Sequence, residues 1–326
     1  MLANGIQIVF GTVTFLNPPV EEVVEWLNLL EELDIKVVDT AEIYGASEQV
    51  LGKAGAASRF TIDTKFPGGA SPKISTKDAV IEACKESLKK LGTDAVDVYY
   101  IHAPDRRVPW KETLSGLNEL YQQGAFKRLG LSNFLAHEVD EAVRVAKENN
   151  FVVPTVYQGN YSAVARRTED EIIPVLRRHN MAFYAYSPIA GGFLSKTRAQ
   201  LASDEEGRYG EGNPLNKVYN GLYNKPSFVA ALDVWEQIAK DEGVSNAELA
   251  YRWIVYHSKL DGGFGDAVVL GARKHEQLRQ TVEMIKKGPL SDAAVGRIDR
   301  IWEDIKGDAW LDNFQMLTAK SGAKQA

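Results

Sequence analysis

The stretch VVDTAEIYG, residues 37–45, decides the fold and also carries candidate chemistry. Its first residues are apolar and β-branched, which is typical of a short strand buried on both faces of a parallel sheet. The apolar run ends at Asp39, and Tyr44 follows shortly after it. The pattern therefore predicts a carboxylate at the end of a strand and a phenol just beyond it.

Two later stretches repeat this arrangement. FTIDTKFPGG, residues 60–69, places Lys65 at the end of a second apolar run, and VDVYYIHAPD, residues 96–105, places His102 at the end of a third. The carboxyl ends of parallel strands meet at one edge of a sheet, so we expect these side chains to gather there. A carboxylate, an ammonium, an imidazole and a phenol in one place indicate proton-transfer chemistry.

Strands and helices alternate along almost the whole chain. The expected strands are 6–12, 36–39, 61–65, 96–102, 128–132, 155–158, 182–186 and 267–271. Helical periodicity is expected over 19–32, 76–91, 110–123, 135–149, 169–179, 229–241 and 276–287. Eight repeated βα units predict an α/β fold, a single closed (β/α)8 TIM barrel over residues 1–326.

The connection between the seventh and eighth strands, about 187–266, is unusually long. It contains a stretch rich in Gly, Asn and Asp at 203–221 and an extra expected helix at 246–258. Long connections on the carboxyl face of a barrel commonly form binding sites or lids. A C-terminal helix is expected at 292–306, and the polar residues from about 317 to 326 predict a disordered tail.

Composition argues against several classes of protein. Of the 326 residues, 44% are hydrophobic and 25% charged, and the net charge of −6 gives no electrostatic case for nucleic-acid or membrane binding. The single cysteine, Cys84, excludes an internal disulfide and is expected to be inert and buried. No signal peptide or membrane-spanning stretch is apparent in the sequence, so we expect a cytoplasmic enzyme or binding protein.

Tyr44 and the three strand-end residues have distinct candidate roles. Tyr44 would donate a proton. A free phenol has a pKa of about 10, and a neighbouring ammonium such as that of Lys65 would lower it. Asp39 would pair with Lys65, and His102 would bind the oxygen of a substrate. Each residue alone has an ordinary structural explanation, but four of them at successive strand ends favour catalysis.

Several other kinds of site are not indicated. The histidines show no metal-ligand spacing, so no metal site is expected. The sequence contains no GxSxG elbow, no P-loop and no GxGxxG after a strand. A nicotinamide cofactor would therefore have to bind without a Rossmann motif.

Taken together and in order, the motifs resemble the aldo-keto reductase superfamily. The resemblance covers nearly the whole chain through VVDTAEIYG, TKFPGG, YYIHAPD, LGLSNF, VYQGNYS, YAYSPIAGG and VVLGARKHEQLRQTV. The segments PTVYQGNY, SPIAGGFL and AYRWIVYHSKL are most similar to the branch of aflatoxin-aldehyde and succinic-semialdehyde reductases. The resemblance implies a TIM barrel, NADPH or NADP+ bound across the strand ends, and a catalytic tetrad of Asp39, Tyr44, Lys65 and His102.

The same resemblance implies contacts along the cofactor. Ser132, Asn133 and Gln158 would hold the nicotinamide carboxamide, and Tyr186 would stack on the nicotinamide ring. The remaining implied cofactor residues are Ser187, Pro188, Ile189, Gly191 and Leu194 along the pyrophosphate, and Gly271, Arg273, Gln277 and Gln280 at the adenosine end. Two cations after Gly271, at the start of a helix, suit a phosphate and hence NADPH over NADH.

The substrate pocket is expected to be aromatic, with Trp110 and Tyr161 as its best candidates because each closely follows a strand end. Related reductases of acidic aldehydes end near an arginine, but the corresponding stretch here, WLDNFQ at 310–315, has none. Arg208 in the long connection is the remaining candidate partner for an anionic group.

The expected function is NADPH-dependent reduction of small-molecule carbonyls, aldehydes first and ketones second. Two alternatives stay open. One is an NADPH-binding, redox-sensing interaction protein similar to potassium-channel β-subunits. The other is NADP-dependent oxidation of an alcohol, for which the same site would serve. The branch includes dimers, so a homodimer is consistent with the resemblance.

Overall fold

The computed structural model describes residues 2, 4–203 and 207–322, and its eight parallel strands close into a barrel in sequence order. Each strand pairs with the next one, and β8 pairs with β1 to complete the circle. The bounds are β1 Gln7–Gly11, β2 Val37–Asp39, β3 Thr61–Phe66, β4 Val96–Ile101, β5 Phe126–Ser132, β6 Pro154–Asn160, β7 Ala182–Tyr186 and β8 Ala267–Leu270. The predicted (β/α)8 TIM barrel is confirmed.

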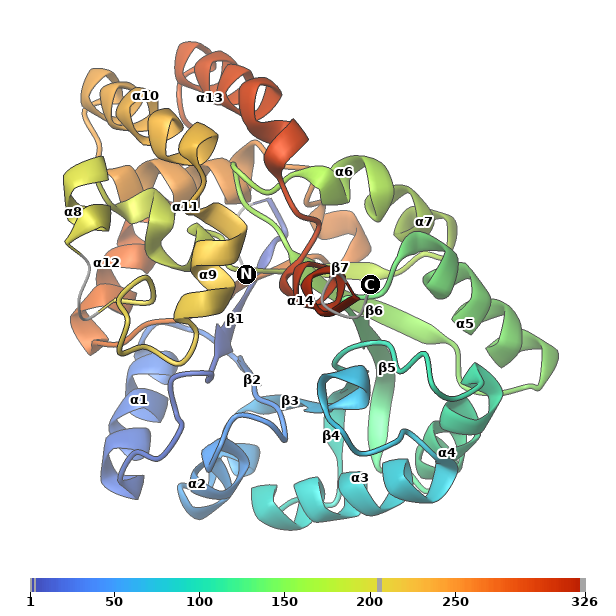
Figure 1. The fold of residues 1–326 in the computed structure, drawn as a ribbon. Coiled ribbons are helices and arrows are strands. Elements are labelled where there is room, and N and C mark those ends of the chain that lie inside the picture. The colour runs from blue at the N-terminus through green and yellow to red at the C-terminus, as the bar shows by residue number, and fades with distance from the viewer. Residues whose placement is uncertain (1, 3, 204–206, 323–326) are drawn as a thin grey trace.

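Helices surround the barrel as a ring, and the shorter helices of the long connection stand over one side of it (Figure 1). Their bounds are α1 Val20–Glu32, α2 Ser47–Lys53, α3 Lys77–Leu91, α4 Trp110–Gln122, α5 Ala136–Glu148, α6 Arg167–Glu171, α7 Ile173–Arg178, α8 Arg198–Ala202, α9 Asn216–Tyr223, α10 Pro226–Glu242, α11 Asn246–Tyr256, α12 His275–Lys286, α13 Asp292–Ile305 and α14 Asn313–Gly322. The extra C-terminal helices α13 and α14 follow the last barrel helix, α12.

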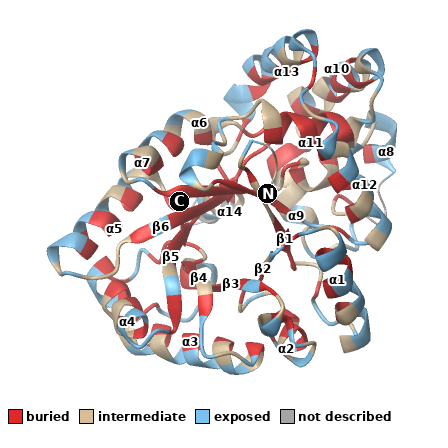
Figure 2. Cartoon of the chain, turned by 180° about the vertical axis from the view of Figure 1, so that it is seen from behind, coloured by how far each residue is buried: buried red, intermediate tan, exposed pale blue. Residues whose placement is uncertain are grey.

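Two apolar cores hold this architecture together. The smaller one fills the barrel interior and includes Val9, Val98, Tyr100 and Val269. The larger one lies between the outside of the strands and the inner faces of the helices, which Figure 2 shows as buried strands and helices that are buried on one side only. Gly130 leaves room for the aromatic ring of Tyr100 inside the barrel, because a Cβ at position 130 would lie 2.2 Å from Tyr100 Cδ1.

The prediction of one continuous helix over 169–179 is wrong, because the structure divides this segment into α6 and α7 at Ile172. Pro174 explains the break. Proline has no N–H to donate to the preceding turn, so it is tolerated in the first turn of α7 but not inside a continuous helix. Helices α2, α8 and α9 were not predicted.

The disordered tail expected from about residue 317 is also corrected, because α14 extends through Gly322. The helix begins after Asp312, whose Oδ1 accepts a hydrogen bond of 2.7 Å from the Gln315 N–H. Met316 is fully buried, and α14 packs against α9. A buried apolar residue therefore anchors a segment whose composition suggested a frayed end. Residues 323–326 lie outside the described part.

Two smaller expectations concern membranes and the cysteine. Among the described helices, none combines the length and the apolar character that a bilayer crossing needs. Cys84 is buried on α3, and its burial raises the pKa of the thiol to about 12. A thiol that stays protonated at neutral pH is a poor nucleophile, so the expectation of an inert residue stands.

Candidate active site

A buried ion pair forms the centre of the candidate site. Lys65 Nζ on β3 lies 2.5 Å from Asp39 Oδ2 at the end of β2, and it also donates to the Thr40 carbonyl at 2.7 Å. Lys65 is 0% exposed and Asp39 is 2% exposed. The second Asp39 oxygen accepts a bond of 2.9 Å from Gln158 Nε2 on β6. Every charge of the pair is thus matched inside the protein, which a buried ion pair requires.

Tyr44 lies beside this pair, in the turn before α2. Its ring faces Lys65 Nζ at 5.2 Å from the ring centroid and meets the His102 ring edge-on at 5.7 Å between centroids. Burial, with a smaller contribution from the Asp39 carboxylate, raises the pKa of Tyr44 above its ordinary value. The expected lowering by Lys65 is therefore wrong for this structure, because desolvation dominates and Asp39 already balances the ammonium.

His102, directly after β4, is a neutral imidazole at physiological pH. Burial lowers its pKa to about 3, and the Lys65 ammonium contributes to this shift. Its Nδ1 is buried and has no hydrogen-bond partner among the described residues. Asn133 Nδ2 donates to the His102 carbonyl at 2.8 Å, which fixes the backbone of this residue. A neutral imidazole can donate a hydrogen bond to an uncharged oxygen.

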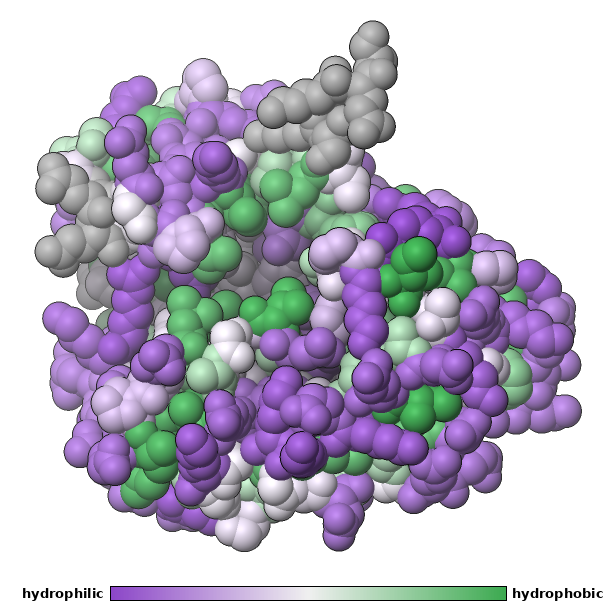
Figure 3. Space-filling model, turned by 60° about the horizontal axis from the view of Figure 1, so that its bottom comes forward, coloured by the Kyte–Doolittle hydropathy of each residue, from purple (hydrophilic) through white to green (hydrophobic). Residues whose placement is uncertain are grey.

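A cavity of about 410 Å³ opens over these residues at the carboxyl end of the strands. Figure 3 shows a hollow in the surface of the molecule, with apolar side chains along part of its border. The predicted residues that line the cavity are Asp39, Tyr44, His102, Ser132, Asn133, Gln158, Tyr186, Ser187, Pro188, Ile189, Gly191, Arg208, Gly271, Arg273 and Gln277. Lys65 lies beneath the lining.

Three residues other than glycine that follow β5 and β7, in or next to the cavity lining, have left-handed backbone conformations. Asn133, Ser187 and Ala190 have φ values of 60°, 58° and 51°. Left-handed backbone at residues other than glycine costs energy and is often found at functional sites. Gly191, with φ of 67°, lies so close to Tyr219 that an added Cβ would be 2.1 Å from the ring. Glycine at position 191 therefore lets the segment after β7 lie close to the Tyr219 ring.

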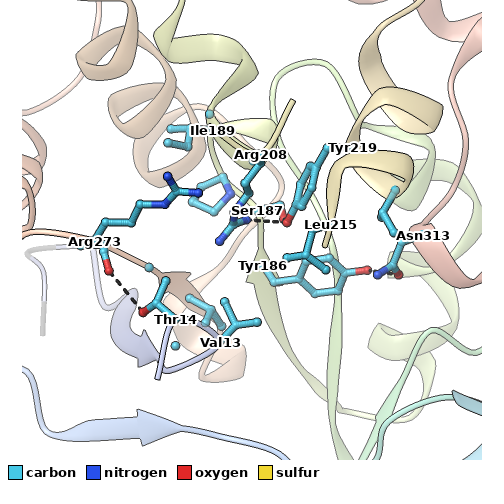
Figure 4. Close-up of a pocket in the computed structure, with 18 of the residues that line it drawn as sticks. Val13, Thr14, Tyr186, Ser187, Ile189, Arg208, Leu215, Tyr219, Arg273 and Asn313 are labelled. Atoms are coloured by element: carbon cyan, nitrogen blue, oxygen red, sulfur yellow. Dashed lines mark hydrogen bonds between the residues drawn. The ribbon is translucent and has the colours of Figure 1, made fainter. Parts of the chain in front are cut away.

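The charges around the cavity are mostly positive, although the protein as a whole is acidic. Lys196, Arg208 and Arg273 line it, and Asp39 is the one carboxylate among the described lining residues. Arg208 Nη1 donates to Tyr219 Oη at 2.5 Å, and its guanidinium lies 4.9 Å from that ring centroid. Figure 4 shows Arg208 and Arg273 entering the cavity from different sides. Such a cavity is suited to an anionic ligand.

Two predicted substrate residues lie elsewhere. Tyr161 is fully buried, and its hydroxyl donates to Glu169 at 2.7 Å and accepts from the Lys259 N–H at 2.9 Å. Trp110 begins α4 and packs on Phe134, with 4.9 Å between ring centroids. Neither lines the cavity, so these two predictions are wrong. Both residues follow a strand end in sequence, but each side chain packs into the outer core.

Two predicted cofactor residues also lie outside the cavity lining. Leu194 is 1% exposed and belongs to the outer core. Gln280 faces solvent on α12, where its Nε2 donates to Glu276 at 3.0 Å. Gln277, by contrast, lines the cavity and accepts a 3.0 Å bond from the Arg273 N–H, which joins the start of α12 to the end of β8.

Several lining residues were missed by the sequence reasoning. They include Val13, Thr14, Ile43, Leu215, Val218, Tyr219 and Asn313, and many of these are labelled in Figure 4. Ile43 adjoins Tyr44 and could have been found from that position. Tyr219 and Asn313 come from α9 and α14, two helices that were not predicted, and no sequence signal placed either helix beside the barrel mouth.

Comparison with known proteins agrees with this geometry. The model of the aldo/keto reductase family matches residues 7–303. The chain belongs to the aldo-keto reductase family.

Individual relatives support the same assignment. The chain is 40% identical to the oxidoreductase sirO of Leptosphaeria maculans over 315 residues, which cover 93% of this chain and 95% of that protein. It is 38% identical to human aflatoxin B1 aldehyde reductase member 4 over 283 residues, covering 81% of this chain and 84% of the relative. Rattus norvegicus aflatoxin B1 aldehyde reductase member 2 is 36% identical over 288 residues, 84% of this chain and 78% of the relative.

These findings confirm the predicted family and the likeness to the aflatoxin-aldehyde reductase branch. This aldo-keto reductase is an oxidoreductase, and its relatives include aldehyde reductases. The four residues Asp39, Tyr44, Lys65 and His102 meet at the place where a barrel of this type carries its active site.

In this aldo-keto reductase, Asp312 adds a pH-dependent contribution to stability. Burial raises the pKa of its carboxyl to about 7, and Glu138 acts in the same direction, while the N–H groups of Gln315 and Phe314 and the charge of Arg106 oppose the shift. A raised pKa means that the folded state binds the proton more tightly. The contribution of Asp312 to the free energy of unfolding is therefore fully present at low pH and is lost as the pH rises through about 7.

We therefore expect Asp312→Asn to be more stable relative to wild type at pH 8 than at pH 5. Asparagine retains an oxygen that can accept from the Gln315 N–H but carries no charge. Thermal unfolding of both proteins across this pH range measures the difference in Tm. A constant difference would show that Asp312 titrates identically in the folded and unfolded chain.

Proposed function

We propose that this protein reduces aldehydes, and ketones as a second class, to alcohols with NADPH, and that Tyr44 supplies the proton. One observation carries the proposal: a buried Asp39–Lys65 pair lies against the ring of Tyr44, and the neutral imidazole of His102 lies beside it. This set can bind and protonate an oxygen atom but offers no metal ligand cluster among the described residues. Protonation of a reduced carbonyl is the reaction it suits.

The residues around the cavity fit NADPH. Cationic side chains and a segment of tight, partly left-handed backbone after β7 match the needs of a long anionic ligand. Arg273 adjoins the start of α12, where a phosphate is favoured by both charge and helix dipole. When bound, NADPH would supply the hydride. Ser132, Asn133 and Gln158 would hold its carboxamide, and Tyr186 would lie against the ring.

The protein's own residues would manage the proton and the oxygen. His102 would donate a hydrogen bond to the carbonyl oxygen and orient it toward Tyr44. The raised pKa of Tyr44 keeps the phenol protonated until an alkoxide develops, and an alkoxide is a stronger base than a phenolate. Lys65 would then stabilise the negative charge that remains on Tyr44, and Asp39 would hold Lys65 in place.

The substrate end of the cavity is mixed in character. Val13, Ile43, Leu215 and Val218 provide apolar contacts, and Arg208 provides a cation near Tyr44. The Arg208 guanidinium is close enough to Tyr44 to oppose the rise in the pKa of its phenol. Aldehydes with an apolar body would fit this lining, and Arg208 could form an ion pair with a carboxylate on the same molecule.

The assignment of Arg273 to the 2′-phosphate gives a direct prediction. Arg273→Ala should weaken NADPH binding by about 10- to 100-fold, in keeping with the loss of a charge-assisted contact, and leave NADH binding nearly unchanged. Fluorescence titration with both cofactors measures this. The matched control is Arg279→Ala on α12, the helix that Arg273 precedes, since Arg279 pairs with Glu32 and does not line the cavity. A parallel loss of both cofactors would remove the assignment.

The function itself is tested by steady-state oxidation of NADPH with a panel of aldehydes that includes 4-nitrobenzaldehyde and succinic semialdehyde. We expect many turnovers per enzyme molecule, and the ranking of aldehydes will define the pocket. Tight NADPH binding without repeated turnover would instead favour the redox-sensing interaction protein. A much higher kcat/KM for alcohols with NADP+ than for aldehydes with NADPH would favour the oxidation alternative.

A further inference from the structure

The C-terminal helix α14 makes two side-chain contacts inside the candidate site. Tyr186 Oη, at the end of β7, lies 2.8 Å from Asn133 Oδ1 and 3.1 Å from Asn313 Oδ1. In the same helix, Gln315 Nε2 donates to the Asn133 carbonyl at 3.0 Å. Figure 4 shows the Tyr186 hydroxyl directed at Asn313. One helix therefore contacts both Tyr186 and Asn133.

The backbone of Asn133, one of these two contact partners, is conformationally constrained. Asn133 has a φ of 60°, so its conformation persists only if neighbouring contacts maintain it. Its amide nitrogen donates to the His102 carbonyl at 2.8 Å and to Ser132 Oγ at 3.1 Å. A change at Asn133 would thus reach His102 as well as Tyr186.

The helix is itself firmly attached. Gln315 Oε1 accepts a bond of 3.3 Å from Arg106, which pairs with Glu138 at 2.7 Å. Phe314 packs next to Arg106, whose guanidinium lies 5.7 Å from the ring centroid. The beginning of α14 is therefore tied to the segment after β4 and to α5, which gives Asn313 and Gln315 fixed positions.

We propose that Asn313 and Gln315 are positioning residues of the active site. Asn313 fixes the ring of Tyr186 through its hydroxyl, and Gln315 fixes the strained backbone of Asn133. The inference rests on the proposed function, because Tyr186 and Asn133 are the residues assigned to the nicotinamide. Neither Asn313 nor Gln315 donates or accepts the transferred proton, so their effect passes through the residues that they hold.

A double-mutant cycle tests this mechanism. Asn313→Ala should weaken NADPH binding about three- to tenfold, the range expected for one lost hydrogen bond. Tyr186→Phe keeps the ring and removes the hydroxyl. In the Tyr186→Phe background, Asn313→Ala should weaken binding no further, because the bond it removes is already gone. Fluorescence titration measures cofactor binding without reliance on turnover.

Two more variants complete the design. Thr318→Ala is the control, because the Thr318 hydroxyl donates to the Phe314 carbonyl within α14 and does not contact the cavity; it should bind NADPH like wild type. Asn313→Asp keeps an acceptor for Tyr186 and should restore most of the affinity lost in Asn313→Ala. It also provides the test if the alanine variant folds poorly.

The outcomes separate this inference from the proposed function. Failure of the wild-type protein to bind NADPH would overturn the proposed function and the inference with it. Normal wild-type binding, with Asn313→Ala equally damaging whether or not Tyr186 has its hydroxyl, would overturn the inference alone. So would Asn313→Asp that binds as weakly as Asn313→Ala. Non-additive loss with rescue by Asn313→Asp supports it.

Discussion

Replacement of Tyr44 by phenylalanine is expected to lower kcat for aldehyde reduction by about 10²–10⁴-fold, the usual contribution of a positioned acid. The substitution removes only the hydroxyl, so the ring keeps its contacts with Lys65 and His102. NADPH affinity should remain close to that of wild type. Steady-state rates with a reactive aldehyde, together with a fluorescence titration of NADPH, measure the two quantities separately.

The Tyr44 experiment also has an internal control in Tyr121→Phe, which changes an exposed phenol on α4 away from the cavity. That variant should retain full activity. If Tyr44→Phe lost NADPH affinity and turnover to the same degree, Tyr44 would be a binding residue and not the acid. If turnover persisted at the wild-type rate, another group or water would have to supply the proton.

Replacement of Lys65 by methionine should abolish most activity and destabilise the protein. Lys65 and Asp39 are both buried, so the variant leaves the Asp39 carboxylate without its cation. Breaking one side of a buried pair costs about 3–5 kcal/mol in unfolding free energy. The proton donor also loses the ammonium that would stabilise its phenolate, and kcat should fall by at least about 10²-fold.

The double variant Asp39→Asn, Lys65→Met separates these two effects. Removing both charges avoids an unpaired buried carboxylate, so stability should return toward that of wild type while activity stays low. Denaturant unfolding and steady-state rates on the two variants measure this. An active Lys65→Met protein, or a double variant as unstable as the single one, would show that the pair does not have the assigned role.

The sequence predicted the barrel because its signals are local. The strands are short, largely apolar runs, and most of them have a polar residue at or next to the carboxyl end, where parallel strands bring such residues to one face. Asp39, Lys65 and His102 were therefore predictable as neighbours without any knowledge of side-chain contacts, and the structure brings them together. Gln158 was predicted for another purpose, but its bond to Asp39 shows that it also supports the ion pair.

The errors have a common physical origin in tertiary packing. Trp110 and Tyr161 follow strand ends, but whether such a side chain faces the cavity or the outer core depends on the loop that carries it. Asn313 and Tyr219 reach the site from helices whose position is set by contacts far away in the sequence. The pKa of Tyr44 was predicted from its charged neighbour, whereas the burial of the phenol, which no sequence pattern reports, decides its direction.

The most direct test of the central claim is isotope transfer. The wild-type protein would be incubated with an aldehyde and with NADPH that is deuterated at the transferring position of its nicotinamide ring, and the alcohol would be analysed by mass spectrometry. We predict multiple turnovers, with one deuterium on the carbinol carbon of the product and almost none from Tyr44→Phe. An alcohol without deuterium, or no alcohol despite bound NADPH, would contradict hydride transfer at this site.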